Sequence, residues 1–355
     1  MGNHVGIICL EVTMGDDDHT AAPRQFELGP FAFDSGYTLP NAKLAYRTFG
    51  SLNSAKDNAV LFPHMYSGNS ASLAGLIGEG RALDPSQYFI ILPDQFGNGL
   101  SSSPSNTPAP FDRGQFPPVA ISDDVRAQHR LVTEEFGITA LHAVVGWSMG
   151  GQQTYEWAVR YPEAVRRAAV FAATARTSAH NKLFVDLHTE LLRSDPAFAD
   201  GFYTDPADVR LGLKRHAMAF TMTSTSARFF RDEMWRALGF ASADDYGQGF
   251  MRGYYQVMDP NNLLCQAAKW RAGDVGLHTG GDLAAALGRI TAKFVAVAFS
   301  DDMFAPVADH EADVAMIPGA RLRVIDSPMG HFTMFGLLPE DAAAIDEVLA
   351  GLLKS

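Results

Sequence analysis

Apolar residues along the chain follow two different patterns. Near the beginning, residues 26–33 and 43–49 alternate apolar and polar positions, which predicts an antiparallel pair of strands with one buried face. Further along, short continuous apolar runs suit strands that are buried on both faces of a parallel sheet. These runs are residues 59–62, 89–92, 143–145, 168–171, 294–299 and 322–325.

Segments with helical character alternate with these runs. Residues 122–136 are predicted as one helix, with Ser122 as its N-cap and with Asp123 and Asp124 favourable in its first turn. Further helices are predicted at residues 152–160 and 339–353. The alternation of strands and helices predicts an α/β fold with a mostly parallel central sheet flanked by helices.

Residues 174–290 interrupt this alternation. They are rich in Met, Phe, Arg and Tyr at helical spacing and contain little that resembles a buried strand. Because the sheet pattern resumes after them, we interpret this segment as a helical cap, or lid, inserted into one α/β domain; a separate helical domain is the alternative. The core then consists of residues 1–173 and 291–355, with residues 1–24 as a loose leader.

Composition narrows the choice of protein class. The chain has 355 residues, of which 47 % are hydrophobic and 19 % charged, as in a globular protein with a sizeable core. A net charge of −12 argues against nucleic acid or an anionic membrane surface as a partner. Cys9 and Cys265 are the only cysteines, so we expect no disulfide framework and no cysteine-based metal site. Neither a signal peptide nor a membrane span is indicated, and a cytoplasmic location is expected.

A serine lies at the centre of the most informative motif. Ser148 belongs to Gly-Trp-Ser-Met-Gly-Gly, between a predicted strand and a predicted helix. Gly-x-Ser-x-Gly in this context is typical of the nucleophile elbow of α/β-hydrolases, where the hydroxyl projects above the sheet. A glycine-rich turn without catalytic function is the alternative, because the motif is short.

Later in the chain are the partners that a nucleophilic serine needs, in the order expected for this fold. Asp301 and Asp302 follow the run 294–299, and His331 follows the last strand in a loop that contains glycine. We expect His331 to be the base and prefer Asp301 over Asp302 as the orienting acid, because Asp301 follows the strand more closely.

An oxyanion also requires hydrogen-bond donors. One should be the backbone N–H of Met149, at the start of the helix after the serine. We assign the second to the N–H of Tyr66, in the loop after residues 59–62, with Met65 as the alternative. His64 in the same loop is interpreted as structural.

Longer motifs extend the comparison to one family. Residues 92–104, 146–151, 252–262, 300–306 and 330–331 resemble the homoserine O-acetyltransferase family of α/β-hydrolases. The resemblance implies Ser148, Asp301 and His331 as the triad and Tyr66 and Met149 as donors. It also implies a helical cap that commonly mediates dimerisation, so a homodimer through the cap helices is expected.

Two positions depart from that family. Its acetyltransferases carry an aspartate after the catalytic histidine, which receives the ammonium of the substrate, and an arginine on the first cap helix. Here these positions hold Phe332 and, as aligned, Thr189 next to His188. An unpaired, desolvated ammonium would cost several kcal/mol or more, so the site is predicted to suit a neutral substrate. Esterase members of the family fit these residues better.

The leading hypothesis is therefore a serine carboxylesterase that acts on small, short-chain esters, with no cofactor and no metal. The first alternative is an O-acyltransferase that uses acyl-coenzyme A and an acceptor other than homoserine. Basic residues of the cap could then contact the phosphates, although solvent exposure is their ordinary role. These residues are Lys182, Lys214, Arg215, Arg228 and Arg231. The second alternative is a ligand-binding protein without catalytic activity.

Overall fold

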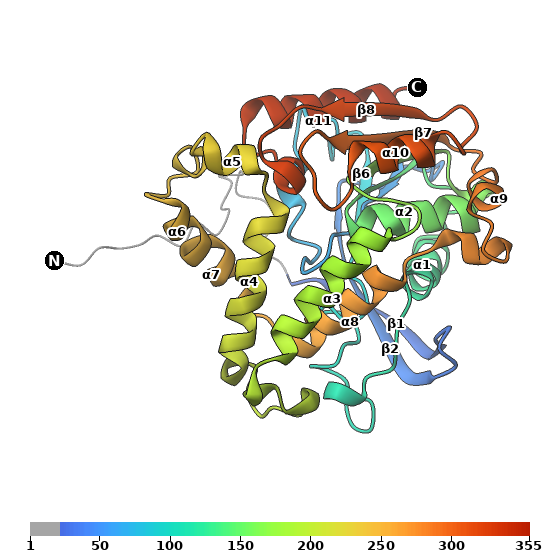
Figure 1. The fold of residues 1–355 in the computed structure, drawn as a ribbon. Helices are drawn as coiled ribbons and strands as arrows, with labels where there is room; N and C mark the ends of the chain where they lie inside the picture. Colours follow the sequence, from blue (N-terminus) through green and yellow to red (C-terminus); the bar gives the residue numbers. More distant parts are fainter. Residues whose placement is uncertain (1–21) are drawn as a thin grey trace.

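A single eight-stranded sheet forms the centre of the molecule (Figure 1). The computed structural model describes residues 22–355, so Cys9 and almost all of the predicted leader lie outside the described residues. The strands are β1 (Arg24–Ala32), β2 (Thr38–Phe49), β3 (Ala59–Leu61), β4 (Phe89–Pro93), β5 (Ala143–Trp147), β6 (Arg167–Phe171), β7 (Lys293–Phe299) and β8 (Arg321–Ile325).

Strand order and direction define an α/β-hydrolase fold, as the sequence predicts. The order across the sheet is β1-β2-β4-β3-β5-β6-β7-β8. β1 pairs with β2 and β2 with β4 in antiparallel fashion, whereas every pairing from β4 to β8 is parallel. The alternating N-terminal segments therefore form the antiparallel edge, and the continuous apolar runs form the parallel part.

The parallel strands are apolar throughout because both faces of the sheet are covered. In β4, Phe89 and Ile91 pack into one core cluster with residues of the helices α1, α2 and α9, while Ile90 and Leu92 pack into another with α11 and the cap. Successive side chains of a strand point to opposite faces, so two buried faces require an uninterrupted apolar run.

Helices surround the sheet and form the cap (Figure 1). Their bounds are α1 (Ile121–Arg130), α2 (Met149–Arg160), α3 (Ala179–Arg193), α4 (Arg210–Ser224), α5 (Ala227–Arg231), α6 (Ala243–Tyr246), α7 (Arg252–Tyr255), α8 (Pro260–Ala272), α9 (Leu283–Leu287), α10 (Val307–Val314) and α11 (Pro339–Leu353). Within residues 22–355, no strand lies between β6 and β7, and helices α3 to α9 occupy the predicted insertion. No helix in this part of the chain is long and apolar enough to cross a membrane.

The start of α1 differs from the prediction. Its N-cap is Ala120, and the carboxylate of Asp123 accepts the N–H of Ala120 at 2.8 Å. Ser122 therefore does not cap the helix; its hydroxyl donates to Asp34 instead. Asp123 and Asp124 do lie in the first turn, where a carboxylate is favourable.

Candidate active site

Ser148 lies at the sharp turn between β5 and α2. Its backbone dihedral angles are φ 56° and ψ −124°, a combination that residues other than glycine rarely adopt. The N–H of Ser148 donates to the carbonyl of Phe171 in β6 at 2.9 Å, so the sheet holds this strained residue in place. The geometry is that of a nucleophile elbow.

The glycines of the motif are required by close backbone contacts. A Cβ atom on Gly146 would lie 2.0 Å from the carbonyl oxygen of Gly150, and one on Gly150 would lie 2.1 Å from that of Pro63. Neither neighbour is a flexible side chain that could move away. The motif in this chain is therefore a steric requirement of the turn and not a chance match.

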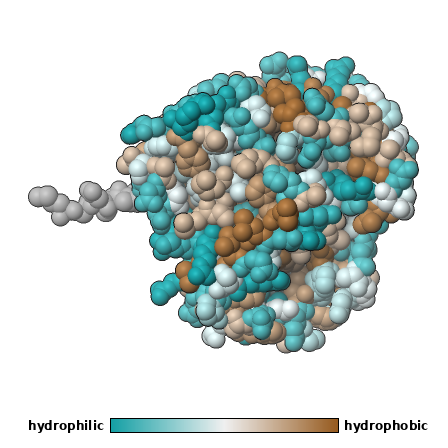
Figure 2. Space-filling view, in the orientation of Figure 1, coloured by the Kyte–Doolittle hydropathy of each residue, from teal (hydrophilic) through white to brown (hydrophobic). Residues whose placement is uncertain are grey.

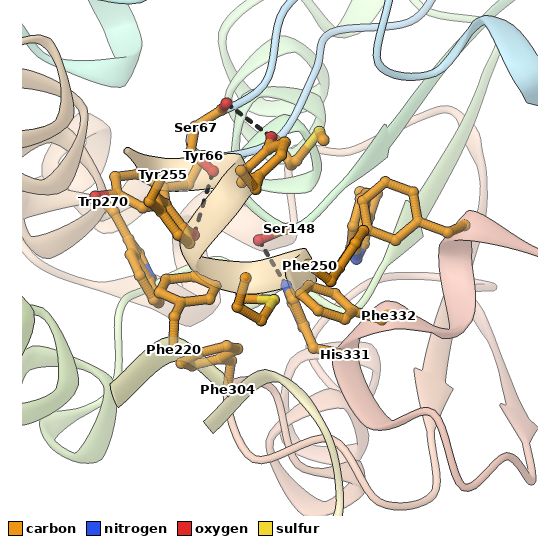
Figure 3. Close-up of a pocket in the computed structure, with 15 residues that line it drawn as sticks. Tyr66, Ser67, Ser148, Phe220, Phe250, Tyr255, Trp270, Phe304, His331 and Phe332 are labelled. Atoms are coloured by element: carbon orange, nitrogen blue, oxygen red, sulfur yellow. Dashed lines mark hydrogen bonds between the residues drawn. The ribbon is translucent and has the colours of Figure 1, made fainter. Parts of the chain in front are cut away.

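A hydrogen-bonded chain connects Ser148 to a buried carboxylate. Nε2 of His331 lies 2.8 Å from Oγ of Ser148 (Figure 3). Nδ1 of His331 lies 2.8 Å from Oδ2 of Asp302. Because a carboxylate only accepts, Nδ1 carries the proton, and Nε2 is left to accept from the serine hydroxyl. The rings of Trp147 and Phe304 flank the imidazole, with centroid distances of 5.3 and 4.9 Å.

The structure corrects the choice between the two aspartates. Asp301, preferred from the sequence, faces away from His331 and forms an ion pair with Arg228 at 2.8 Å. Asp302 is 5 % exposed, and its other carboxylate oxygen accepts the N–H of Phe304 at 2.8 Å. After β7 the chain turns, with the N–H of Asp302 bonded to the carbonyl of Phe299, so the nearer residue points outward and the next one inward.

Two backbone N–H groups near Ser148 have no acceptor among the described residues. One is that of Met149, the first residue of α2, and the other is that of Tyr66. The N–H of Met65 is also without an acceptor, so the alternative from the sequence stays open. Oxyanion binding by these groups stays a prediction.

The pocket around Ser148 is almost entirely aromatic and apolar (Figure 3). Its free volume is about 30 Å³, room for about two water-sized groups. Rings of Phe250 and Phe332 lie on one side of the serine, and Phe220, Phe304 and Trp270 lie on the other. The complete lining is Met65, Tyr66, Ser67, Trp147, Ser148, Phe220, Phe250, Met251, Tyr254, Tyr255, Trp270, Phe304, His331, Phe332 and Phe335.

Only one of the three predicted substrate-pocket residues lies in this lining. Phe332 does, next to His331. His188 and Thr189 do not, so their assignment to the pocket is wrong. His188 is on the buried face of α3, where its ring packs against Phe220 of α4 at a centroid distance of 4.9 Å. The α4 helix therefore separates α3 from the pocket.

A second histidine, His216, supports the pocket wall. Burial lowers the pKa of His216 to about 4, so its ring is neutral near pH 7. Its Nε2 lies 3.3 Å from the hydroxyl of Tyr66, and the ring of Tyr66 stacks on Phe220. These contacts place the Tyr66 side chain as one wall of the pocket.

None of the five basic residues considered for coenzyme A lines the pocket. Arg228 pairs with Asp301 and Asp326, and Arg231 pairs with Asp232. In residues 22–355, no group of three or more His, Cys, Asp or Glu side chains is arranged to hold a metal ion. The described site thus offers neutral, apolar walls around the triad geometry.

Several functional positions were not found from the sequence. The aromatic lining residues Phe220, Phe250, Tyr255 and Trp270 come from the insertion, where helical spacing did not reveal which face would point to the serine. Lys269 is also fully buried, beside Trp270. A lysine within an apolar stretch of helix was the available signal for it.

Comparison with known proteins agrees with the fold. Residues 58–336 match the family model described as alpha/beta hydrolase fold. The chain is 49 % identical over 329 residues to the ethyl acetate hydrolase of Pseudomonas veronii, covering 92 % of this chain and 94 % of that protein. The chain belongs to the alpha/beta hydrolase family.

Two further relatives place it more narrowly. The structure of the acetyl esterase MekB superposes with a TM-score of 0.93 at 48 % identity, covering 94 % of this chain and 97 % of that one. A homoserine O-acetyltransferase of Leifsonia xyli subsp. xyli is 33 % identical over 356 residues, covering 92 % of this chain and 88 % of that protein. The protein is an enzyme of the esterase class, with homoserine O-acetyltransferases as more distant relatives.

Proposed function

We propose that this protein is a serine carboxylesterase that hydrolyses short-chain esters, above all acetates, of neutral alcohols. The observation that carries the proposal is the hydrogen-bonded chain Ser148–His331–Asp302 at the edge of an apolar pocket. Among the described residues, no Asp, Glu, Lys or Arg side chain lines this pocket. The names of the similar acetyl and ethyl acetate hydrolases support the same substrate class.

The first half of the reaction acylates the serine. Oγ of Ser148 attacks the carbonyl carbon of the ester while Nε2 of His331 takes its proton, and Asp302 stabilises the imidazolium that forms. The N–H groups of Met149 and Tyr66 donate to the oxyanion. The C–O bond to the alcohol then breaks, and His331 returns the proton to the leaving alkoxide oxygen, which leaves an acyl-enzyme.

The second half releases the acid. Nε2 of His331 takes a proton from a water molecule, whose oxygen attacks the acyl carbon on Ser148. The second tetrahedral intermediate collapses, the Oγ–carbon bond breaks, and His331 returns the proton to Ser148. The products are a carboxylic acid and the regenerated enzyme.

Pocket size and chemistry support a short acyl group and a neutral alcohol. A pocket with a free volume of only about 30 Å³ favours a short acyl group over a long one. Phe332 is 7 % exposed and leaves no carboxylate at the position that would receive an ammonium. An amino-acid acceptor would lose the hydration of its charges here without gaining a partner.

The test is a side-by-side assay of ethyl acetate or p-nitrophenyl acetate against acetyl-coenzyme A plus homoserine. We expect turnover of the esters, loss of it in Ser148→Ala, and a rate that falls from acetate to octanoate. Consumption of acetyl-coenzyme A that depends on an added alcohol would favour the acyltransferase instead. Absence of any turnover by the wild type would favour a ligand-binding protein.

We also propose a homodimer through the cap helices. Four exposed apolar side chains, Leu183 and Leu187 of α3 and Met218 and Met222 of α4, lie on these two neighbouring helices. A hydrophobic band crosses this part of the surface (Figure 2). Contiguous exposed apolar surface is typical of interaction sites. Sedimentation of the wild type and of Leu187→Glu should show a dimer and a monomer, respectively.

A further inference from the structure

A fully buried lysine connects the cap to the loop under the active site. Lys269 lies on α8 and is 0 % exposed. Its ammonium donates to Oε1 of Gln95 at 2.9 Å, to the carbonyl of Phe96 at 2.6 Å and to Oδ2 of Asp124 at 2.7 Å. Its three protons therefore match three acceptors. Such a group is costly to bury, so its position calls for a physical explanation.

The contact with Lys269 fixes which way the Gln95 side chain faces. An ammonium has no acceptor capacity, so the amide oxygen of Gln95 must point toward it and the amide NH2 must point away. That NH2 donates to the carbonyl of His64 at 3.1 Å and to the carbonyl of Met65 at 3.3 Å. The positive charge of the Lys269 ammonium next to Oε1 also makes the NH2 group of Gln95 a stronger donor.

The Met65 carbonyl controls the direction of the candidate oxyanion donor. The carbonyl of Met65 and the N–H of Tyr66 belong to the same planar trans peptide, so they point in opposite directions. The carbonyl accepts from the Gln95 amide, from Nδ1 of His64 at 2.8 Å and from the N–H of Gly68 at 3.3 Å, so the Tyr66 N–H points the opposite way, where it has no acceptor among the described residues. Lys269 contributes to this orientation from two hydrogen bonds away, because it fixes the Gln95 amide that donates to the Met65 carbonyl.

His64 supports the same peptide and needs to be neutral to do so. Burial lowers its pKa to about 3. Nδ1 lies 2.8 Å from the Met65 carbonyl and can only donate to it, which leaves Nε2 to accept from the N–H of Gln95 at 3.3 Å. His64 therefore acts in the loop as a structural residue, as the sequence predicts.

We propose that Lys269 is a positioning residue that, through Gln95, holds the Met65–Tyr66 peptide with its N–H directed at the oxyanion. The inference rests on the proposed esterase function and extends it to a residue of the cap. Stabilisation of the transition state at Ser148 thereby depends on the contacts that Lys269 of α8 makes with the core.

The principal test compares Lys269→Met with the wild type in ester hydrolysis, with rates divided by active sites titrated with an organophosphate. We expect kcat to fall about 10- to 100-fold, less than or comparable to the loss of a direct oxyanion donor, with KM changed less than about threefold. Affinity for a trifluoromethyl ketone, which forms a tetrahedral oxyanion on the serine, should fall by a similar factor.

A second variant guards against simple misfolding. Gln95→Met removes the NH2 donors but keeps the bonds from Lys269 to Asp124 and Phe96, and it should show the same loss of kcat. The double variant should be no slower than Lys269→Met, because both changes break one chain of contacts. Glu156→Gln is the matched control, since it changes a half-buried hydrogen bond with Nε2 of His278 that does not touch this loop.

The outcomes separate the two proposals. If the wild type hydrolyses esters but Lys269→Met and Gln95→Met keep the wild-type kcat per titrated site, the positioning role is wrong and the esterase function stands. The role is also wrong if ketone affinity is unchanged or if Glu156→Gln lowers kcat equally. If the wild type hydrolyses no ester, the proposed function itself fails.

Discussion

Nδ1 of His331 lies 2.8 Å from Oδ2 of Asp302, and this contact determines which nitrogen of the imidazole faces Ser148. The carboxylate accepts the Nδ1 proton, so Nε2 is free to act as a base. The preceding residue, Asp301, is bound to Arg228 on α5 and does not take part in this contact.

This arrangement predicts a large difference between two neighbouring substitutions. In Asp302→Asn the amide NH2 would face Nδ1, favour the tautomer with its proton on Nε2, and lower kcat by about 10³- to 10⁴-fold. Asp301→Asn loses only a partly exposed ion pair and should change kcat less than about threefold. Rates per titrated active site would show this, and equal losses in both variants would contradict the assignment.

Phe332 should control the fit of the substrate and not the chemistry. Phe332→Ala removes an aromatic wall that packs on Phe335 and Phe250, with centroid distances of 5.4 and 6.3 Å. Loss of about 1–2 kcal/mol of apolar contact predicts a KM for ethyl acetate raised about 5- to 30-fold, with kcat within about threefold. Esters of bulkier alcohols, such as benzyl acetate, should gain relative to ethyl acetate.

The matched control for this prediction is Val324→Ala, on β8, where the side chain is 51 % exposed and does not line the pocket. It should leave both kinetic constants unchanged. If Phe332→Ala lowers kcat and leaves KM unchanged, the residue acts on the triad and not on the bound ester.

Two glycines should respond to alanine in opposite directions. In Gly150→Ala the new Cβ would lie 2.1 Å from the carbonyl oxygen of Pro63. Either the turn at Ser148 or the loop that contains Tyr66 must then move, which should lower the free energy of unfolding by about 1–3 kcal/mol or more. Gly351 in α11 has no atom within 4 Å of its Cβ position, and Gly351→Ala should stabilise by about 0.5–1 kcal/mol. Denaturant unfolding measures both, and a neutral Gly150→Ala would contradict the close contact.

His310 should make the fold sensitive to acid. It is buried on α10, neither ring nitrogen has a hydrogen-bond partner among the described residues, and burial lowers its pKa to about 4, with nearby Asp302 opposing and His331 assisting. In the unfolded chain the pKa of a histidine is near 6.5. The neutral, buried His310 therefore costs no stability above that pH, and the folded state loses stability as the pH falls from about 6.5 toward 4. The loss between pH 8 and pH 5 is about 2 kcal/mol.

His310→Leu should therefore reduce the difference in unfolding free energy between pH 8 and pH 5 by that amount. His180→Leu, which changes an exposed histidine on α3, serves as the control and should leave the difference as in the wild type. An unaltered pH dependence in His310→Leu would show that this ring takes up a proton in the folded protein.

Much of the core follows from local sequence. Runs buried on both faces are apolar at every position, so the parallel strands could be predicted, and the elbow could be predicted because Gly146 and Gly150 meet backbone atoms. His331 was found because its place after the last strand fixes it in the chain order of this fold.

The remaining site residues could not be predicted, because their roles depend on side-chain directions and helix packing that a local sequence pattern does not reveal. Asp301 and Asp302 are adjacent, and only the turn closed by the Asp302 N–H decides which one points inward. Thr189 and His188 lie on the first long helix of the cap, yet the packing of α3 behind α4 removes them from the pocket. The partners of Lys269 are about 145 to 174 positions away along the chain, beyond any local pattern.

The groups that break and form bonds all come from loops of the sheet, whereas Phe220, Phe250, Tyr255 and Trp270 come from the inserted helices. The insertion therefore supplies a large part of the pocket wall and none of the triad, while Phe304 and Phe332 of the wall come from the core. Mutation or recombination within the insertion can change the range of accepted esters while the triad and its reaction are inherited unchanged. The condition is that α8 keeps the contacts of Lys269 with the core.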